Sequence, residues 1–106
     1  MYTYYIIGGF MLNSIDVSGL KKIIGSVNII DIREEEEYND SHIKSSINVP
    51  NAKLMLYPER YLTKLEKYYI YCQFGKTSIK TCMYLNKIGY NVINIIGGYD
   101  NLSKKL

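Results

Sequence analysis

The chain has 106 residues, and several residue types are absent or scarce: it has no tryptophan, two cysteines, two prolines and one histidine. The two cysteines, Cys72 and Cys82, offer neither a disulfide framework nor the ligand spacing of a metal site. We therefore expect reduced thiols and no metal. A cytoplasmic location follows as the default expectation for a protein with reduced thiols.

The chain also lacks a long hydrophobic run and a dense tract of lysine and arginine. Residues 4–12 are apolar, but this stretch is too short to span a bilayer and has no basic segment before it, so we expect neither a membrane span nor a signal peptide. We interpret residues 1–12 as an N-terminal extension, either an extra strand or a disordered lead-in. The net charge of +3 makes nucleic acid a weak candidate partner and would suit a small anionic substrate.

The chain as a whole is 47% hydrophobic and 22% charged, which is ordinary for one globular domain. We place this domain at residues 13–106. Hydrophobic runs and helix-ending residues predict alternating strands and helices. We expect strands at 13–17, 27–32, 46–49, 68–71 and 91–96. We expect helical segments at 18–24 (capped by Ser18), 34–39 (helix or turn), 51–66 (interrupted near Pro58), 78–88 and 99–106 (helix or tail). This alternation predicts an α/β domain with a mainly parallel sheet.

The most informative segment is the loop that joins strand 68–71 to helix 78–88 and begins with Cys72. Amide groups in such a loop converge on one point, and the helix N-terminus adds partial positive charge. Both favour a thiolate, which is the nucleophilic form of cysteine. We therefore expect the Cys72 sulfhydryl to lie exposed in a ring of amides as the catalytic nucleophile; the alternative is a buried structural cysteine. For Cys82 we expect a small core residue, with a resolving thiol as the alternative.

The first three loop residues after the cysteine, Gln73, Phe74 and Gly75, are expected to contribute mainly backbone N–H groups. Gly75 would supply an unusual backbone conformation. Phe74 would form an apolar wall that selects the acceptor.

Polar residues complete the candidate site. Lys76 is either an anion anchor beside the thiolate or a solvated charge. Thr77 and Ser78 would cap the helix and could also donate hydrogen bonds to the sulfur. Arg33 could be half of a structural ion pair with Glu37 or a neighbouring acid. For His42 we favour a structural role over that of a general base.

Five segments, in order and spacing, resemble a rhodanese domain over residues 13–103. They are Asp31-Ile32-Arg33-Glu34 with Glu37-Tyr38, then Ser41-His42-Ile43, Ile47-Asn48-Val49-Pro50, the loop from Cys72 to Ser78, and Gly89-Tyr90-Asn91-Val92 with Ile96-Gly97-Gly98-Tyr99. The resemblance implies a three-layer α/β fold and a single-domain sulfurtransferase without a cofactor. In that family the loop cysteine takes a sulfane sulfur from a donor such as thiosulfate, becomes a persulfide and passes the sulfur to cyanide or another thiol. The resemblance also implies that Arg33 lies close to the pocket and could contact the anionic donor, which is the alternative to its structural ion pair.

Two other functions stay open from the sequence. In the first, the same persulfide is passed between proteins, with a cysteine desulfurase or a thiol protein as partner and with slow small-molecule turnover. In the second, the loop serves a phosphatase or an arsenate reductase; these enzymes need a longer loop that ends in an arginine, and here Thr77 stands instead. Ser41, Phe74 and Thr77 depart from the family's usual residues, and these departures leave the donor open.

Overall fold

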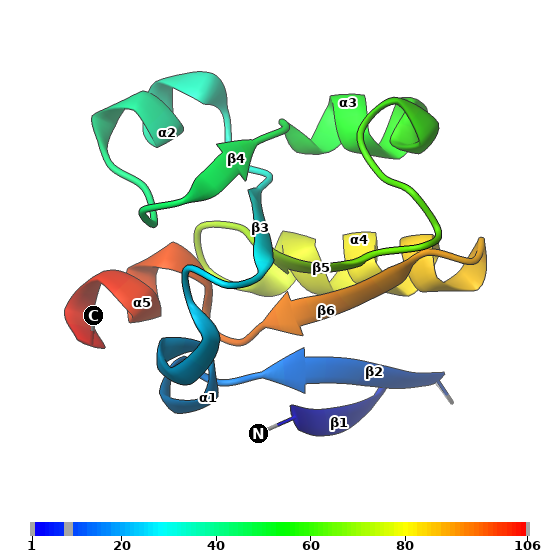
Figure 1. Cartoon of the computed structure of the whole chain (residues 1–106), viewed down its shortest axis with the longest axis horizontal. Helices are drawn as coiled ribbons and strands as arrows, with labels where there is room; N and C mark the ends of the chain where they lie inside the picture. The colour runs from blue at the N-terminus through cyan, green and yellow to red at the C-terminus, as the bar shows by residue number, and fades with distance from the viewer. Residues whose placement is uncertain (1, 8–9, 106) are drawn as a thin grey trace.

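A computed structural model describes residues 2–7 and 10–105, and these residues form a six-stranded sheet in the order β1-β2-β6-β5-β3-β4 (Figure 1). The strands are β1 (Tyr2–Ile7), β2 (Phe10–Ile15), β3 (Asn28–Asp31), β4 (Ser46–Asn48), β5 (Lys67–Tyr71) and β6 (Asn91–Ile95). β1 pairs antiparallel with β2, and every other pairing is parallel. The predicted mainly parallel sheet is therefore confirmed.

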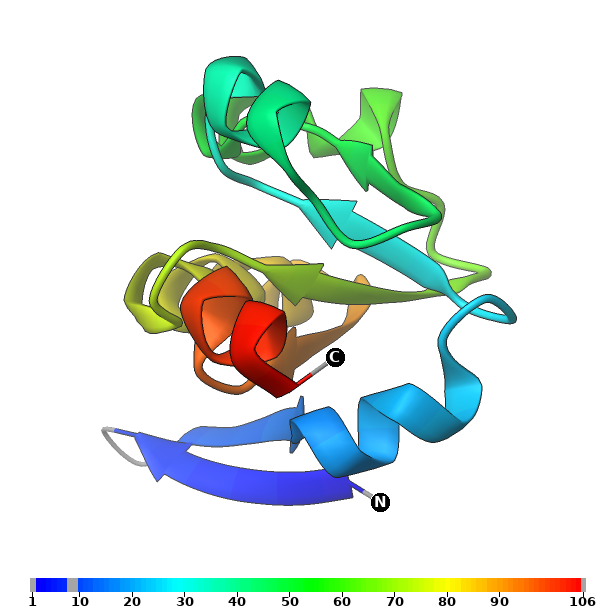
Figure 2. The same ribbon diagram turned by 90° about the vertical axis from the view of Figure 1, so that its left-hand side faces the viewer.

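Helices cover both faces of this sheet, which gives the predicted three layers. α1 (Val17–Ile23) and α5 (Gly98–Lys105) bury side chains against one face. α3 (Asn51–Leu56) and α4 (Lys76–Lys87) do so against the other. α2 (Glu35–Asp40) contributes no buried residue, and a 3-10 helix occupies Pro58–Arg60. Figure 2 shows β1 and β2 at the edge of the molecule opposite β4.

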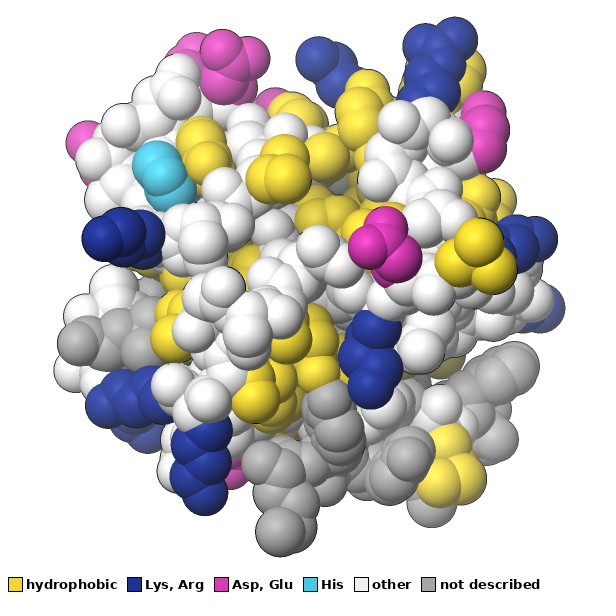
Figure 3. Space-filling view, in the orientation of Figure 1, with side chains coloured by type: hydrophobic (Ala, Val, Ile, Leu, Met, Phe, Trp, Pro, Cys, Tyr) yellow, Lys and Arg dark blue, Asp and Glu magenta, His cyan; other side chains and the backbone are white. Residues whose placement is uncertain are grey.

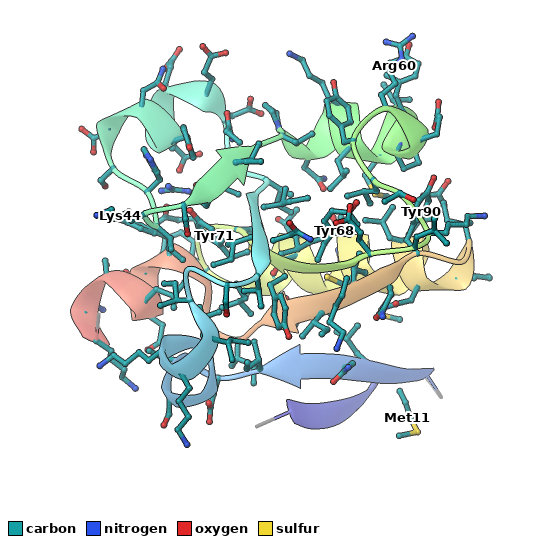
Figure 4. All side chains as sticks on the ribbon, in the orientation of Figure 1. Met11, Lys44, Arg60, Tyr68, Tyr71 and Tyr90 are labelled. Carbon is teal, nitrogen blue, oxygen red and sulfur yellow. The ribbon has the colours of Figure 1, made fainter. Side chains whose placement is uncertain are left out.

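The central strand β5 shows why the sheet is covered on both sides. Tyr68 and Ile70 pack in the core under α3 and α4, whereas Tyr69 and Tyr71 pack in the core under α1 and α5. Figure 4 labels Tyr68 and Tyr71, which lie toward opposite ends of this strand. A strand buried on both faces is apolar along its length, as parallel strands are.

Several predicted boundaries were wrong. The helical region expected at 51–66 ends at Arg60, the last residue of the 3-10 helix. The strand expected at 13–17 is β2, which begins at Phe10 and ends at Ile15. The cap of α1 is Asp16 rather than Ser18, because its Oδ1 accepts a hydrogen bond of 2.8 Å from the Gly19 amide. α4 begins at Lys76 rather than Ser78, because Gly75 adopts a left-handed conformation with φ of 91° and turns the chain into the helix two residues earlier.

The N-terminal residues expected to form an extra strand or a lead-in fall mainly in β1 and β2, and residues 1, 8 and 9 lie outside the described part. Within residues 2–7 and 10–105, the helices are all too short or too polar to cross a membrane.

Candidate functional site

The candidate site lies where the parallel strands β3 and β5 end side by side. Asp31 is the last residue of β3 and pairs in register with Tyr71, the last residue of β5. Cys72 follows β5 directly, and Arg33 follows β3 by two residues. The carboxyl ends of parallel strands are the usual position of ligand sites in α/β sheets. The topology thus brings the predicted residues of the two segments together.

The Cys72 sulfur lies inside the turn that leads into α4. Its Sγ accepts hydrogen bonds from the Gly75 amide at 3.1 Å and from the Ser78 amide at 3.3 Å. Ser78 stands in the first turn of α4, where amides have no partner within the helix. The sulfur therefore acts as the acceptor at the positive end of the helix, an arrangement that favours a negative charge there.

Only 6% of the surface of Cys72 is exposed, so the expectation of an exposed sulfhydryl was wrong. The reason is that the loop folds over the sulfur, and its amides turn inward instead of facing solvent. The expected ring of amides is present in part, since two amides contact the sulfur.

The hydroxyl group of Ser78 is also part of this cradle. Its Oγ lies 3.3 Å from the Cys72 Sγ, 3.3 Å from the Gly75 carbonyl oxygen and 2.7 Å from Oδ1 of Asn94, a residue of β6. The predicted capping roles of Thr77 and Ser78 were wrong, because Gly75 is the N-cap residue and its helix α4 has no side-chain cap hydrogen bond. The predicted contact between the Ser78 hydroxyl and the sulfur is present.

Backbone contacts from the start of α5 hold the loop in place. The Tyr99 amide donates to the Cys72 carbonyl at 2.8 Å, and the Asp100 amide donates to the Gln73 carbonyl at 2.9 Å. The approach is so close that a Cβ on Gly98, where φ is 65°, would lie 2.6 Å from both carbonyl oxygens. Glycine at position 98 thus allows α5 to fix the backbone on which the cysteine stands.

Arg33 takes part in a buried ion pair, which was one of its two predicted roles, with Asp31 as the acid. Its Nη2 lies 2.7 Å from Asp31 Oδ2, its Nη1 donates to Gln73 Oε1 at 3.1 Å, and its guanidinium lies 4.2 Å from the centre of the Tyr99 ring. Burial lowers the pKa of Arg33, but the hydrogen bonds and charges of Asp31 and Tyr71 together raise it more, so the net shift is upward. Arg33 thereby ties the end of β3 to the cysteine loop through Gln73.

Two hollows border the loop, and their charges differ. One contains Phe74, which is 66% exposed, together with Tyr99, Glu37 and Asp40. Figure 3 shows acidic side chains gathered at the upper left, over α2, the helix that carries these two acids. The other hollow, between α3 and α4, is lined by Lys76 and Thr77 and also by Asn51, Met55, Lys80 and Thr81. Lys76 is exposed there, on a helix face next to the loop.

Comparison with known proteins decides the family. The family model of the rhodanese-like domain matches residues 16–105. The chain belongs to the rhodanese-like domain family.

Relatives of this rhodanese-like domain include sulfurtransferases. The adenylyltransferase and sulfurtransferase uba4 of Ogataea parapolymorpha is 32% identical over 79 residues, which are 74% of this chain and 20% of uba4. The thiosulfate sulfurtransferase GlpE of Coxiella burnetii is 30% identical over 73 residues, covering 68% of this chain and 67% of GlpE. The crystal structure of a rhodanese-related protein from Thermoplasma volcanium superposes with a TM-score of 0.79 at 27% identity and covers 87% of this chain and 91% of that one. The domain spans about a fifth of the uba4 sequence.

Two further residues of the domain have the structural roles that we favoured. Cys82 has no exposed surface, and burial raises the pKa of its thiol. The His42 ring stacks on Tyr38 with centroids 3.8 Å apart, and its Nδ1 lies 2.7 Å from the Tyr38 carbonyl oxygen. Among the described side chains, no group of three or more His, Cys, Asp or Glu is placed to hold a metal ion.

Reasoning from the sequence missed Asn94, whose side chain contacts the Ser78 hydroxyl. A signal was present: Asn94 is the one polar residue between the apolar residues of segment 92–96. A polar residue at an inward position of a buried strand needs a hydrogen-bond partner, and that need could have directed attention to it.

Proposed function

We propose that this rhodanese-like domain is a sulfurtransferase that carries a sulfane sulfur as a persulfide on Cys72. The observation that carries the proposal is the position of the Cys72 sulfur, which accepts two amide hydrogen bonds at the N-terminus of α4. Such donors stabilise an anionic sulfur in a site from which water is largely excluded. The same donors would stabilise the negative charge of a persulfide.

With thiosulfate as donor, the reaction has two balanced displacement steps. The Cys72 thiolate attacks the outer sulfur of thiosulfate; the new S–S bond forms while the old one breaks, and sulfite leaves with the bonding electron pair. Cyanide, or the thiolate of an acceptor, then attacks the outer sulfur of the persulfide. Thiocyanate, or an acceptor persulfide, leaves, and the Cys72 thiolate is restored. This is ping-pong chemistry through a covalent intermediate.

The neighbouring residues have separate roles in this proposal. Gly75 and Ser78 supply the two amides that bind the sulfur. Lys76 attracts the anionic donor from its exposed position, and Phe74 forms an apolar wall at the entrance. Arg33 supports Gln73 instead of contacting the donor, because its guanidinium already binds Asp31, Gln73 and the Ser41 carbonyl.

The test is a cyanolysis assay in which thiosulfate and cyanide give thiocyanate and sulfite. Cys72→Ser should abolish turnover, because an alcohol cannot carry the sulfane sulfur. Cys82→Ala is the matched control: it removes the other thiol, which is buried, and should retain most of the activity. Thiocyanate formation by Cys72→Ser at the wild-type rate would overturn the proposal.

A second candidate function is supported by the exposure of Phe74. A large apolar side chain that is 66% exposed beside the cysteine would suit a protein surface better than a small anion. The domain would then pass persulfide sulfur between proteins, from a donor such as a cysteine desulfurase to a thiol protein. This candidate predicts that the persulfide forms readily while cyanide turnover is negligible, and that Phe74→Ala slows transfer to a protein thiol but not to cyanide.

A further inference from the structure

A polar pair, Asn94 and Ser78, is buried in the core under α4. Asn94 is 1% exposed and Ser78 is fully buried, and the residues around them in this core are apolar. Burial of an amide in apolar surroundings costs free energy unless it is hydrogen-bonded. The 2.7 Å contact between Ser78 Oγ and Asn94 Oδ1 gives the amide oxygen a donor and joins β6 to the cysteine loop.

The Ser78 hydroxyl has one proton and three acceptors within reach. Asn94 Oδ1 is at 2.7 Å, whereas the Cys72 Sγ and the Gly75 carbonyl oxygen are both at 3.3 Å. A separation of 2.7 Å is the preferred length of an O–H···O hydrogen bond, so the proton points to Asn94. The oxygen lone pairs of the hydroxyl then face the sulfur and accept the proton of the Cys72 thiol.

Loss of the Cys72 thiol proton changes which hydrogen bonds the Ser78 hydroxyl can make. A thiolate cannot donate, so the sulfur and Asn94 compete for the single Ser78 proton. As long as Asn94 holds that proton, the thiolate is hydrogen-bonded only by the amides of Gly75 and Ser78. An anion with fewer hydrogen bonds is less stabilised in its ground state and attacks faster once formed.

We propose that Asn94 is a positioning residue that holds the Ser78 hydroxyl away from the Cys72 thiolate and thereby keeps the sulfur reactive. The inference rests on the proposed role of Cys72 as nucleophile. It adds to that role a residue that never touches the sulfur and acts only through Ser78.

The neighbouring strand provides a matched control. Ser14 of β2 pairs in register with Asn94 and is fully buried, but its hydroxyl has no hydrogen-bond partner among the side chains and backbone that the structure describes. Ser14→Ala therefore removes a buried polar group beside Asn94 without changing the contact between Asn94 and Ser78. If the loss of any buried polar group at this place in the sheet changes the reactivity of Cys72, Ser14→Ala will change it as well.

The experiment measures alkylation of Cys72 by iodoacetamide, in which the thiolate forms a C–S bond and iodide leaves. The rate is followed to the alkaline plateau, where the thiolate fraction no longer limits it, and peptide mass mapping assigns the product. Asn94→Leu frees the Ser78 hydroxyl to donate a hydrogen bond to the thiolate. That hydrogen bond stabilises the thiolate and is partly lost when the sulfur attacks. The plateau rate of alkylation should therefore fall about three- to tenfold. Ser14→Ala should keep the wild-type plateau rate.

The decisive comparison repeats Asn94→Leu in a Ser78→Ala background. Without the hydroxyl the effect of Asn94→Leu should vanish, because Asn94 acts only through Ser78; a double-mutant cycle isolates this dependence. Asn94→Ala, with the same expected results, replaces Asn94→Leu if the latter does not fold. An equal fall in both backgrounds, an unchanged rate or a faster rate would overturn the inference. Alkylation needs no sulfur donor, so such a result would leave the cyanolysis test of the proposed function unaffected.

Discussion

Substitution of Gly98 by alanine tests how the start of α5 holds the cysteine loop. A Cβ at this position would lie 2.6 Å from the carbonyl oxygens of Cys72 and Gln73. These atoms belong to the backbone, and both accept hydrogen bonds from α5, so neither can move without breaking a contact. The substitution should therefore displace the loop itself.

The magnitude has two parts. The left-handed conformation of Gly98 costs an alanine about 1 kcal/mol or more. The clash adds about 1–3 kcal/mol, as overpacking does. The sum, about 2–4 kcal/mol, is a large fraction of the stability of a domain and corresponds to a fall in melting temperature of roughly 10–20 °C.

The assay is thermal and urea unfolding of Gly98→Ala beside a control, Gly25→Ala. Gly25 has a positive φ of 95° as well, but a Cβ there would meet no atom within 4 Å. The control thus includes the conformational cost without the clash and should lose only about 1–2 kcal/mol. At temperatures where both variants are folded, Gly98→Ala should also transfer sulfur more slowly, because small misplacements of a reacting group cost large factors in rate. Equal loss of stability in the two variants would refute the reasoning about the clash.

Three further changes have defined outcomes. Arg33→Ala should lower the free energy of unfolding by about 3–5 kcal/mol, because it leaves the buried Asp31 carboxylate unpaired; a urea titration measures this, and a loss below about 1 kcal/mol would contradict it. The raised pKa of Cys82 means that the folded state keeps a thiol proton that the unfolded chain gives up above about pH 9, so stability falls as pH rises from there. The slope contributed is at most about 1.4 kcal/mol per pH unit, and it should be absent from Cys82→Ala in alkaline urea titrations; identical slopes would speak against it. Lys76→Ala should reduce kcat/KM for thiosulfate by no more than about fivefold, as an exposed charge does, while Lys80→Ala, one helical turn further from the loop, should have a smaller effect; the reverse order would show that Lys76 is not the anion anchor.

The sequence was sufficient to predict the layers of the fold. The order of strands and helices, the continuous apolar run of β5 and the loop after Cys72 are local patterns, and the structure has them where expected. Asp31 and the cysteine loop lie at a common edge of the sheet, because the carboxyl ends of parallel strands meet there.

Other features depend on contacts between distant segments. The Cys72 carbonyl accepts a hydrogen bond from the Tyr99 amide of α5, and the hydroxyl partner of Ser78 stands 16 residues away on β6. The start of α4 depends on the left-handed conformation of Gly75. A glycine can adopt this conformation but does not have to, so the sequence alone does not fix where the helix begins. Arg33 forms its ion pair with Asp31 and not with Glu37, because Asp31 is buried beside it. Burial depends on the whole fold, so a local sequence pattern does not predict it.

The central claim, that Cys72 carries the transferred sulfur, is tested most directly by intact-mass analysis and peptide mapping of the protein after incubation with thiosulfate. If Cys72 carries the sulfur, the protein gains one sulfur atom, located on the peptide that contains Cys72 and removed by cyanide as thiocyanate. An added sulfur found on Cys82, or thiocyanate production with no sulfur on Cys72 at any time, would contradict it.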